Sequence, residues 1–304
     1  MNTQTPVTPD LAAVKAKQQA TWSSGNYALI GSTLQIVGEE LCEAIDLKPG
    51  ASVLDVAAGN GNATIAAARR FAEVTSTDYV QSLLDASKAR ADAQGMDNIM
   101  YQIADAEALP FAAGSFDLVL SLLDLHWVND LPGALAQIRH VLRPDGLFLG
   151  ALLGGETLSE LRAVLLAAEA EVSGGASPRV APKVDLRDAG ALLQRAGFAL
   201  PVADADTLTV SYPNALALMR ELRGMGEGNA VAGRSRRFTR RAVLLRAAAL
   251  YEERFADADG RVPATFQVLY LTGWAPHDSQ PRPLHPGSAQ ASLARALDAD
   301  RSEP

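Results

Sequence analysis

Apolar and polar positions follow two rhythms along this chain, and together they predict strands that alternate with helices. Five short apolar runs have the length of buried strands; they lie at 52–57, 73–78, 98–105, 115–123 and 146–153. Between them, apolar residues recur with a helical period; these stretches cover 63–71, 80–94 and 131–142. This order predicts a mostly parallel sheet with helices on both of its faces.

Two more strands and several helices flank this alternation. The strands are expected at 206–213 and 265–276, which brings the sheet to seven strands. Helices are expected before the first strand and between the fifth strand and the last; they cover 10–24, 34–45, 157–172, 185–197, 214–223 and 239–255. The predicted fold class is α/β, with an N-terminal helical lid and helical insertions before the last strand.

The same elements divide the chain into three parts. Residues 1–49 form a helical extension and residues 50–275 form one α/β domain, in which 50–155 is the core and 156–275 a later part. Residues 276–304 are rich in Pro, Ser and Ala and are expected to form a flexible tail.

Composition narrows the class of protein. With 48% apolar residues the chain has enough apolar side chains for a full core, and its net charge of −8 disfavours general nucleic-acid binding. No run of 18 apolar residues predicts a membrane span, and the N-terminus lacks a secretory signal, so we expect a cytoplasmic protein. The single cysteine, Cys42, can form neither an intramolecular disulfide nor a thiolate metal site by itself.

A glycine turn follows the first predicted strand directly. The sequence Asp-Val-Ala-Ala-Gly-Asn-Gly-Asn occupies 55–62, with Gly59 and Gly61 just before the next helix. Glycines at such a turn let a ligand approach the backbone closely, and the helix that follows directs its amide N–H groups toward an acidic ligand group. An ordinary tight turn is the alternative interpretation.

Two carboxylates end the next two strands. Asp78 ends the second strand, 19 residues after Gly59, where an acidic residue accepts hydrogen bonds from both ribose hydroxyls of a nucleoside. Asp105 ends the third strand, where a carboxylate accepts from an exocyclic amine. The carboxyl ends of parallel strands meet at the ligand-binding edge of an open sheet, so these groups are expected to face one ligand.

With these motifs, residues 50–155 resemble the class I S-adenosylmethionine-dependent methyltransferases. The stretches ALPFAAGSFDLVLS (108–121) and LRPDGLFL (142–149) are also typical of that family. The resemblance implies a Rossmann-like fold, S-adenosyl-L-methionine as cofactor and a donor-binding core at 50–155, with 156–275 on the acceptor side. The donor-binding residues that it implies are Asp55, Ala57, Gly59, Gly61, Asp78, Tyr79, Asp105, Ala106 and Leu122. Ala57 departs from the family pattern, which often has glycine there.

A nicotinamide dinucleotide is the competing ligand. Its pyrophosphate motif requires a third glycine, G-x-G-x-x-G, but Thr64 stands at that position. This departure, together with the two acidic strand ends, favours the methyl donor.

The two parts of the chain resemble different branches of this superfamily. Residues 14–121 are similar to small-molecule methyltransferases of the quinone-biosynthesis type. Residues 122–288 are similar to the respiratory complex I assembly factors and to the related BioC-like malonyl-carrier methyltransferases; segments that carry this likeness include LHWVNDLPGAL (125–135) and VPATFQVLYLTGW (262–274). A hybrid that joins within SFDLVLS is therefore our hypothesis.

These resemblances imply two functions. The first is methyl transfer to a small-molecule or carrier-bound acceptor. The alternative is a complex I assembly factor of the arginine-hydroxylase type, which acts on a respiratory-chain subunit. Iron-dependent hydroxylation usually uses two histidines and one carboxylate, but the four histidines form no H-x-D pair and no metal site is predicted.

The acceptor side has fewer candidate residues. His126 and Trp127 follow the fourth strand, so we expect Trp127 in the acceptor wall and His126 as a general base. Trp22 and Tyr27 are candidate acceptor residues in the N-terminal lid. The alternatives are ordinary core packing for both tryptophans and for Tyr27, and helix capping for His126.

Overall fold

A single mixed sheet of seven strands forms the centre of the described structure. The computed structural model describes residues 10–24, 35–224, 238–281, 287–288 and 292. Its strands follow the order β3-β2-β1-β4-β5-β7-β6, and only β7 runs antiparallel to its neighbours. They are β1 (Ser52–Val56), β2 (Glu73–Asp78), β3 (Ile99–Ile103), β4 (Phe116–Leu122), β5 (Leu142–Leu153), β6 (Ala199–Tyr212) and β7 (Val262–Trp274). The seven-stranded, mostly parallel α/β fold predicted from the sequence is confirmed.

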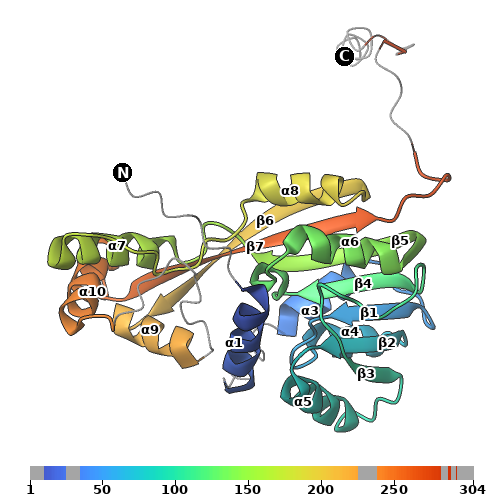
Figure 1. Cartoon of the computed structure of the whole chain (residues 1–304), viewed down its shortest axis with the longest axis horizontal. Coiled ribbons are helices and arrows are strands. Elements are labelled where there is room, and N and C mark those ends of the chain that lie inside the picture. The colour runs from blue at the N-terminus through green and yellow to red at the C-terminus, as the bar shows by residue number, and fades with distance from the viewer. Residues whose placement is uncertain (1–9, 25–34, 225–237, 282–286, 289–291, 293–304) are drawn as a thin grey trace, which may run out of the picture.

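Helices cover both faces of the sheet, as Figure 1 shows. On one face α4 (Asn62–Ala68) and α5 (Gln81–Asp92) lie against the first strands, and α3 (Gln35–Glu43) packs on α4 and against β5 and β7. On the other face α6 (Leu131–Val141) and α8 (Leu186–Arg195) pack over β4, β5 and β7. Within the described residues, no helix combines the length and the apolar character that crossing a membrane requires.

The central strands are buried because both of their faces carry apolar side chains. Val53 and Leu54 of β1 are fully buried on opposite faces of the sheet. Strand β4 pairs with β1 in parallel, with Val53 opposite Leu118 and Asp55 opposite Leu120. The fourth strand along the chain is thus the direct neighbour of the first.

A long ribbon of β6 and β7 reaches beyond the sheet. Strand β5 pairs only with the 268–274 part of β7, while β6 pairs along the whole of β7. Three helices gather at the far end of the ribbon (Figure 1). They form a second apolar core, which includes the fully buried Tyr251. They are α7 (Ser159–Ser173), α9 (Ala215–Gly224) and α10 (Arg241–Phe255). This cluster lies well away from the turns that follow β1 and β2.

Helix α1 (Leu11–Ser24) lies across the carboxyl ends of the strands. Its bounds agree with the predicted helix at 10–24. The predicted strand at 206–213 was too short, because β6 begins at Ala199. Its inward positions Ala203 and Ala205 have small side chains that give a weak alternating pattern. The predicted tail from 276 onward falls mostly outside the described residues.

Candidate functional site

A cleft opens where β1, β2 and β4 end. Its empty volume is about 610 Å³, with the space that is open to solvent included. A second lobe of about 370 Å³ adjoins it beyond the end of β3 and shares Ala57, Tyr79, Asp124 and Trp127 with it. The first lobe is lined by Trp22, Ala57, Ala58, Gly59, Asn60, Asn62, Asp78, Tyr79, Val80, Leu83, Leu122, Leu123, Asp124 and Trp127.

The glycine turn forms one wall of the first lobe. Ala57, Gly59 and Gly61 all have left-handed backbones, with φ values of 56°, 54° and 85°. A Cβ on Gly59 would meet no atom within 4 Å, so its face is open toward a ligand, whereas a Cβ on Gly61 would lie 2.0 Å from Oγ of Ser87. Gly59 therefore admits close approach of a ligand, and Gly61 lets α5 pack against the turn.

Asp78 lies between the turn and the second lobe. Its Oδ2 accepts a hydrogen bond from the N–H of Gly59 at 2.9 Å, and its Oδ1 accepts one from the N–H of Val80 at 2.8 Å. The side chain is only 3% exposed, and this burial raises its pKa, against the effect of the backbone donors. Each oxygen keeps a further lone pair, so the carboxylate is positioned to accept from a ligand in the cleft.

Asp55 does not line the cleft. It is fully buried under the turn, where its Oδ2 accepts a hydrogen bond from the Thr64 hydroxyl at 2.6 Å and its Oδ1 has no partner. Burial raises the pKa of Asp55 to about 7. Its position points to support of the turn rather than to contact with a ligand.

The second lobe contains Asp105 and Ala106 at the end of β3. Oδ1 of Asp105 accepts from the N–H of Glu107 at 3.0 Å, and Oδ2 accepts from the ammonium group of Lys15 at 2.5 Å. Lys15 also donates to Glu107 at 2.7 Å. Partial burial lowers the pKa of Lys15, but the two carboxylates outweigh it and the net shift is upward.

Helix α1 is held over the cleft by side chains. Gln18 donates to the carbonyl of Trp127 at 3.0 Å, and Gln19 donates to the carbonyl of Tyr79 at 2.6 Å. The rings of Trp22 and Trp127 meet edge to face with centroids 5.0 Å apart. Trp22 and Trp127 thus line the first lobe of the cleft, while Tyr27 lies outside the described residues.

His126 does not line either lobe. Its Nε2 is enclosed without a hydrogen-bond partner, and its Nδ1 faces the N–H of Leu153 at 3.5 Å. Burial, and then the charge of Lys183, hold its pKa well below the usual value. A neutral, enclosed imidazole is poorly placed to act as the general base that the sequence suggested. Across the described residues, no group of three or more His, Cys, Asp or Glu side chains has the arrangement of a metal site.

Most sequence-predicted donor residues meet in this cleft, and the exceptions are informative. Ala57, Gly59, Asp78, Tyr79 and Leu122 line the first lobe, and Asp105 and Ala106 line the second. Asp55 lies buried beneath the turn, and Gly61, which belongs to the turn, packs on Ser87 and lines neither lobe.

Sequence reasoning missed Lys15, Glu107 and Asp124. The acidic pair Asp105 and Glu107, two residues apart after the third strand, was the available signal for Glu107. Lys15 contacts residues 90 or more positions away, so no local pattern predicts it.

The chain matches known proteins along most of its length. Residues 54–150 match a family described as "Methyltransferase domain". Over 192 residues the chain is 52% identical to the arginine-hydroxylase NDUFAF5, mitochondrial, of Danio rerio, a match that covers 63% of this chain and 60% of that protein. It is 36% identical over 262 residues to the malonyl-[acyl-carrier protein] O-methyltransferase of a Methylovorus strain, covering 84% and 86%.

These matches cover different shares of this chain and of the relatives. The chain spans 40 to 60% of the length of the arginine-hydroxylase relatives that it matches. The match of 262 residues is longer than either side of residue 121, so it crosses the expected join. Both groups that residues 122–288 resemble are thus among the relatives, while the quinone-biosynthesis origin of 14–121 stays a prediction. Among solved structures, the YcgJ protein from Bacillus subtilis shares the fold, with a TM-score of 0.58, 16% identity, and coverage of 79% of this chain and 98% of that one.

Proposed function

This chain belongs to the class I S-adenosylmethionine-dependent methyltransferase family, and we propose that it transfers the methyl group of S-adenosylmethionine to a carboxylate on a carrier-bound acyl chain. The observation that carries the proposal is the convergence of the glycine turn, Asp78 and Asp105 on one two-lobed cleft. In the broader form of the same proposal, the methyl acceptor is the carboxylate of a related small molecule. The malonyl-carrier relatives support a carboxylate acceptor.

The lining of the cleft fits the parts of the donor in order. Asp105 in the second lobe would accept from the exocyclic amine of the adenine. Asp78 would accept from the ribose hydroxyls, because its two oxygens are already oriented by the N–H groups of Gly59 and Val80. The amino-acid end would then lie along the turn at Asn60 and Asn62, beside the first turn of α4.

Charge in the cleft also favours the donor. Asp78, Asp105, Glu107 and Asp124 are the acidic residues of the two lobes, and Lys15 is the basic residue that lies against them. The lining therefore carries an excess of negative charge. Such a site favours a ligand whose centre carries the positive charge of a sulfonium.

The chemistry makes limited demands on the protein. The donor, when bound, supplies an already activated methyl group. The residues of the chain must align the acceptor and exclude water, and the edge-to-face pair of Trp22 and Trp127 is placed to do both. A carboxylate is already ionised at neutral pH and needs no base, which agrees with the enclosed position of His126.

Action on a protein partner is the second candidate function. The arginine-hydroxylase relatives favour it, because their identity of 45 to 52% exceeds the 36 to 38% of the malonyl-carrier relatives. In this alternative the partner is a respiratory-chain subunit. The two candidates also go with different compartments. The arginine-hydroxylase relatives are named as mitochondrial, whereas the sequence led us to expect the cytoplasm.

One experiment separates the two candidates. The full chain is incubated with methyl-labelled S-adenosylmethionine and either a malonyl-carrier thioester or the carrier alone, and base-labile methyl ester is counted. We expect label only with the malonyl-carrier thioester. Label on neither, together with a mass increase of 16 Da on an arginine of a co-purified respiratory subunit, would replace the first candidate by the second.

A further inference from the structure

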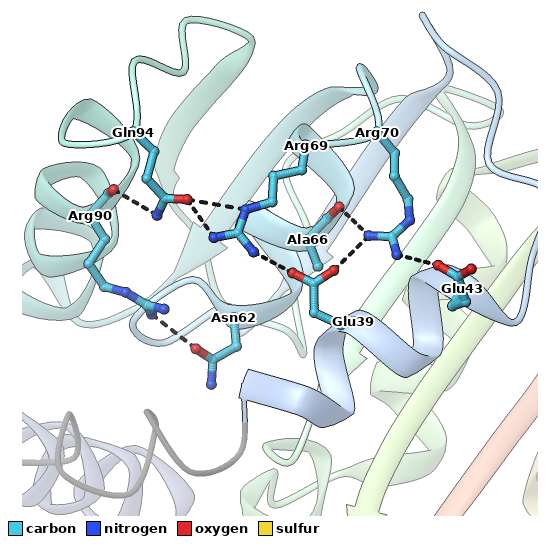
Figure 2. Close-up of polar contacts among 8 residues, drawn as sticks. All are labelled: Glu39, Glu43, Asn62, Ala66, Arg69, Arg70, Arg90 and Gln94. Atoms are coloured by element: carbon cyan, nitrogen blue, oxygen red, sulfur yellow. Dashed lines mark hydrogen bonds and ion pairs between the residues drawn. The ribbon is translucent and has the colours of Figure 1, made fainter.

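Helix α5 supports the glycine turn from behind through Arg90. One guanidinium nitrogen of Arg90 donates to the backbone carbonyl of Asn60 at 2.5 Å and to Oδ1 of Asn62 at 3.0 Å. Figure 2 shows the Asn62 contact, with the guanidinium directed from α5 toward the start of α4. Arg90 itself is absent from the lining of both lobes, whereas Asn60 and Asn62 line the first. The arginine therefore acts on the cleft through the two asparagines.

The turn depends on α5 at a second point as well. Gly61 packs so closely on Ser87 of α5 that no side chain fits between them. Asn60 and Asn62 are 5% and 7% exposed, so their polar groups need protein partners. No side chain caps the N-terminus of α4 by a hydrogen bond. The conformation of residues 60–62 therefore depends largely on the contacts that α5 makes through Ser87 and Arg90.

A polar network fixes Arg90 and its helix in turn. Gln94 donates to the carbonyl of Arg90 and accepts from Arg69, which also donates to Glu39 of α3 (Figure 2). The guanidinium group of Arg70 also donates to the carboxylate of Glu39, at 2.8 Å. Among the residues drawn in Figure 2, Arg90 is the one that contacts the turn. The network links three helices and reaches the glycine turn at this arginine.

We propose that Arg90 is a positioning residue for the amino-acid end of the donor. This inference rests on the proposed function, because that function places the amino-acid end at Asn60 and Asn62. Arg90 engages the carbonyl of Asn60 and Oδ1 of Asn62, so these two acceptors are occupied and repel the donor carboxylate less. Its positive charge lies directly behind the two asparagines and adds to the attraction for that carboxylate.

Two ligands separate this role from general support of the fold. S-adenosylhomocysteine contains the amino-acid end, and methylthioadenosine lacks it. In R90A we expect the affinity for S-adenosylhomocysteine to fall about tenfold, the effect of losing one charge-assisted contact, while the affinity for methylthioadenosine stays within about twofold of wild type. R90K, which keeps the charge, should recover part of the loss. Calorimetry on the full chain measures all of these.

Lys88 provides the matched control. It lies on the same helix, is exposed and pairs with Asp92 within α5, so K88A changes the charge equally without touching the turn. Equal losses for both ligands in R90A, or a loss that K88A reproduces, would overturn the proposal.

Hydrogen exchange of the ligand-free protein gives an independent reading. In R90A, and in R90K if R90A does not fold, the amides of residues 59–63 should exchange faster than in K88A. Unchanged exchange of these amides would contradict the role of Arg90 in supporting the turn. This result does not depend on the ligand. Failure of the wild type to bind S-adenosylhomocysteine would instead count against the proposed function.

Discussion

The ammonium nitrogen of Lys15 lies 2.5 Å from Oδ2 of Asp105, which joins helix α1 to the end of β3 across 90 residues of sequence. The same ammonium contacts Glu107 at 2.7 Å. Asp105 is the carboxylate that we propose accepts a hydrogen bond from the adenine amine, so helix α1 is anchored on a proposed donor-binding group. Opening of α1 and release of the donor should therefore be coupled.

Replacing Lys15 by Met should speed donor release. The ion pair is partly exposed, with side-chain exposures of 29% and 36%, so its loss is worth about 1 kcal/mol or less, or up to about fivefold in rate. We expect stopped-flow dissociation of S-adenosylhomocysteine to accelerate by roughly this factor. K17M, at an exposed position of the same helix, should leave the rate unchanged. Slower release in K15M would mean that Lys15 competes with the ligand for Asp105.

Replacing Asp78 by Ala should weaken the donor complex at least tenfold. Hydrogen bonds to a charged group are worth roughly 1.5 to 3 kcal/mol each, and tenfold corresponds to about 1.4 kcal/mol. D78N keeps one acceptor oxygen and should lose less, while D85A on the exposed side of α5 should lose nothing. Calorimetric titration decides; an unchanged dissociation constant in D78A would place the ribose elsewhere.

Replacing Ala57 by Gly should not destabilise the fold. Ala57 has φ of 56°, a left-handed conformation that strains an L side chain by about 1 kcal/mol or more. Relief of this strain offsets the loss of a buried methyl group and the greater freedom of glycine in the unfolded chain. We expect urea unfolding of A57G to show a free energy equal to wild type or up to about 1 kcal/mol higher. A58G, whose backbone is not left-handed, should be less stable, so equal losses in both would contradict the account.

Replacing Asp55 by Asn should stabilise the protein in a pH-dependent way. The pKa of Asp55 is about 7 in the fold, against 3.8 for an unperturbed carboxyl. A raised carboxyl pKa means that the folded state holds its proton longer, so the cost of ionising Asp55 is absent below pH 4 and complete above pH 7. The advantage of D55N should therefore grow by up to about 1.4 kcal/mol per pH unit across this window. Urea unfolding of both proteins from pH 4 to 8 tests this, and a constant difference would contradict it.

The sheet and much of the cleft were predictable because their signals are local. Each central strand is a short apolar run that ends in a turn or a carboxylate, so Gly59, Asp78 and Asp105 could be located from spacing alone. Strand β6 was cut short, since its inward alanines give little contrast with its outward side chains. The division into domains stays a prediction.

The remaining site residues depend on packing that spacing does not encode. Lys15 and Arg90 contact the cleft walls across 90 and 30 residues. Asp55 has the right spacing for a ligand contact, but the turn covers it. Sequence patterns predict where strands end, whereas contacts with helices that are distant in the sequence decide where each side chain points.

Binding of S-adenosylmethionine in this cleft can be measured by calorimetric titration of the full chain with S-adenosylhomocysteine. We expect one-site binding that is weakened in D78A. We also expect a higher melting temperature with ligand, because a ligand at about 100 times its dissociation constant stabilises the fold by roughly 2.7 kcal/mol. No heat and no change in melting temperature at millimolar ligand, with folded protein, would contradict it.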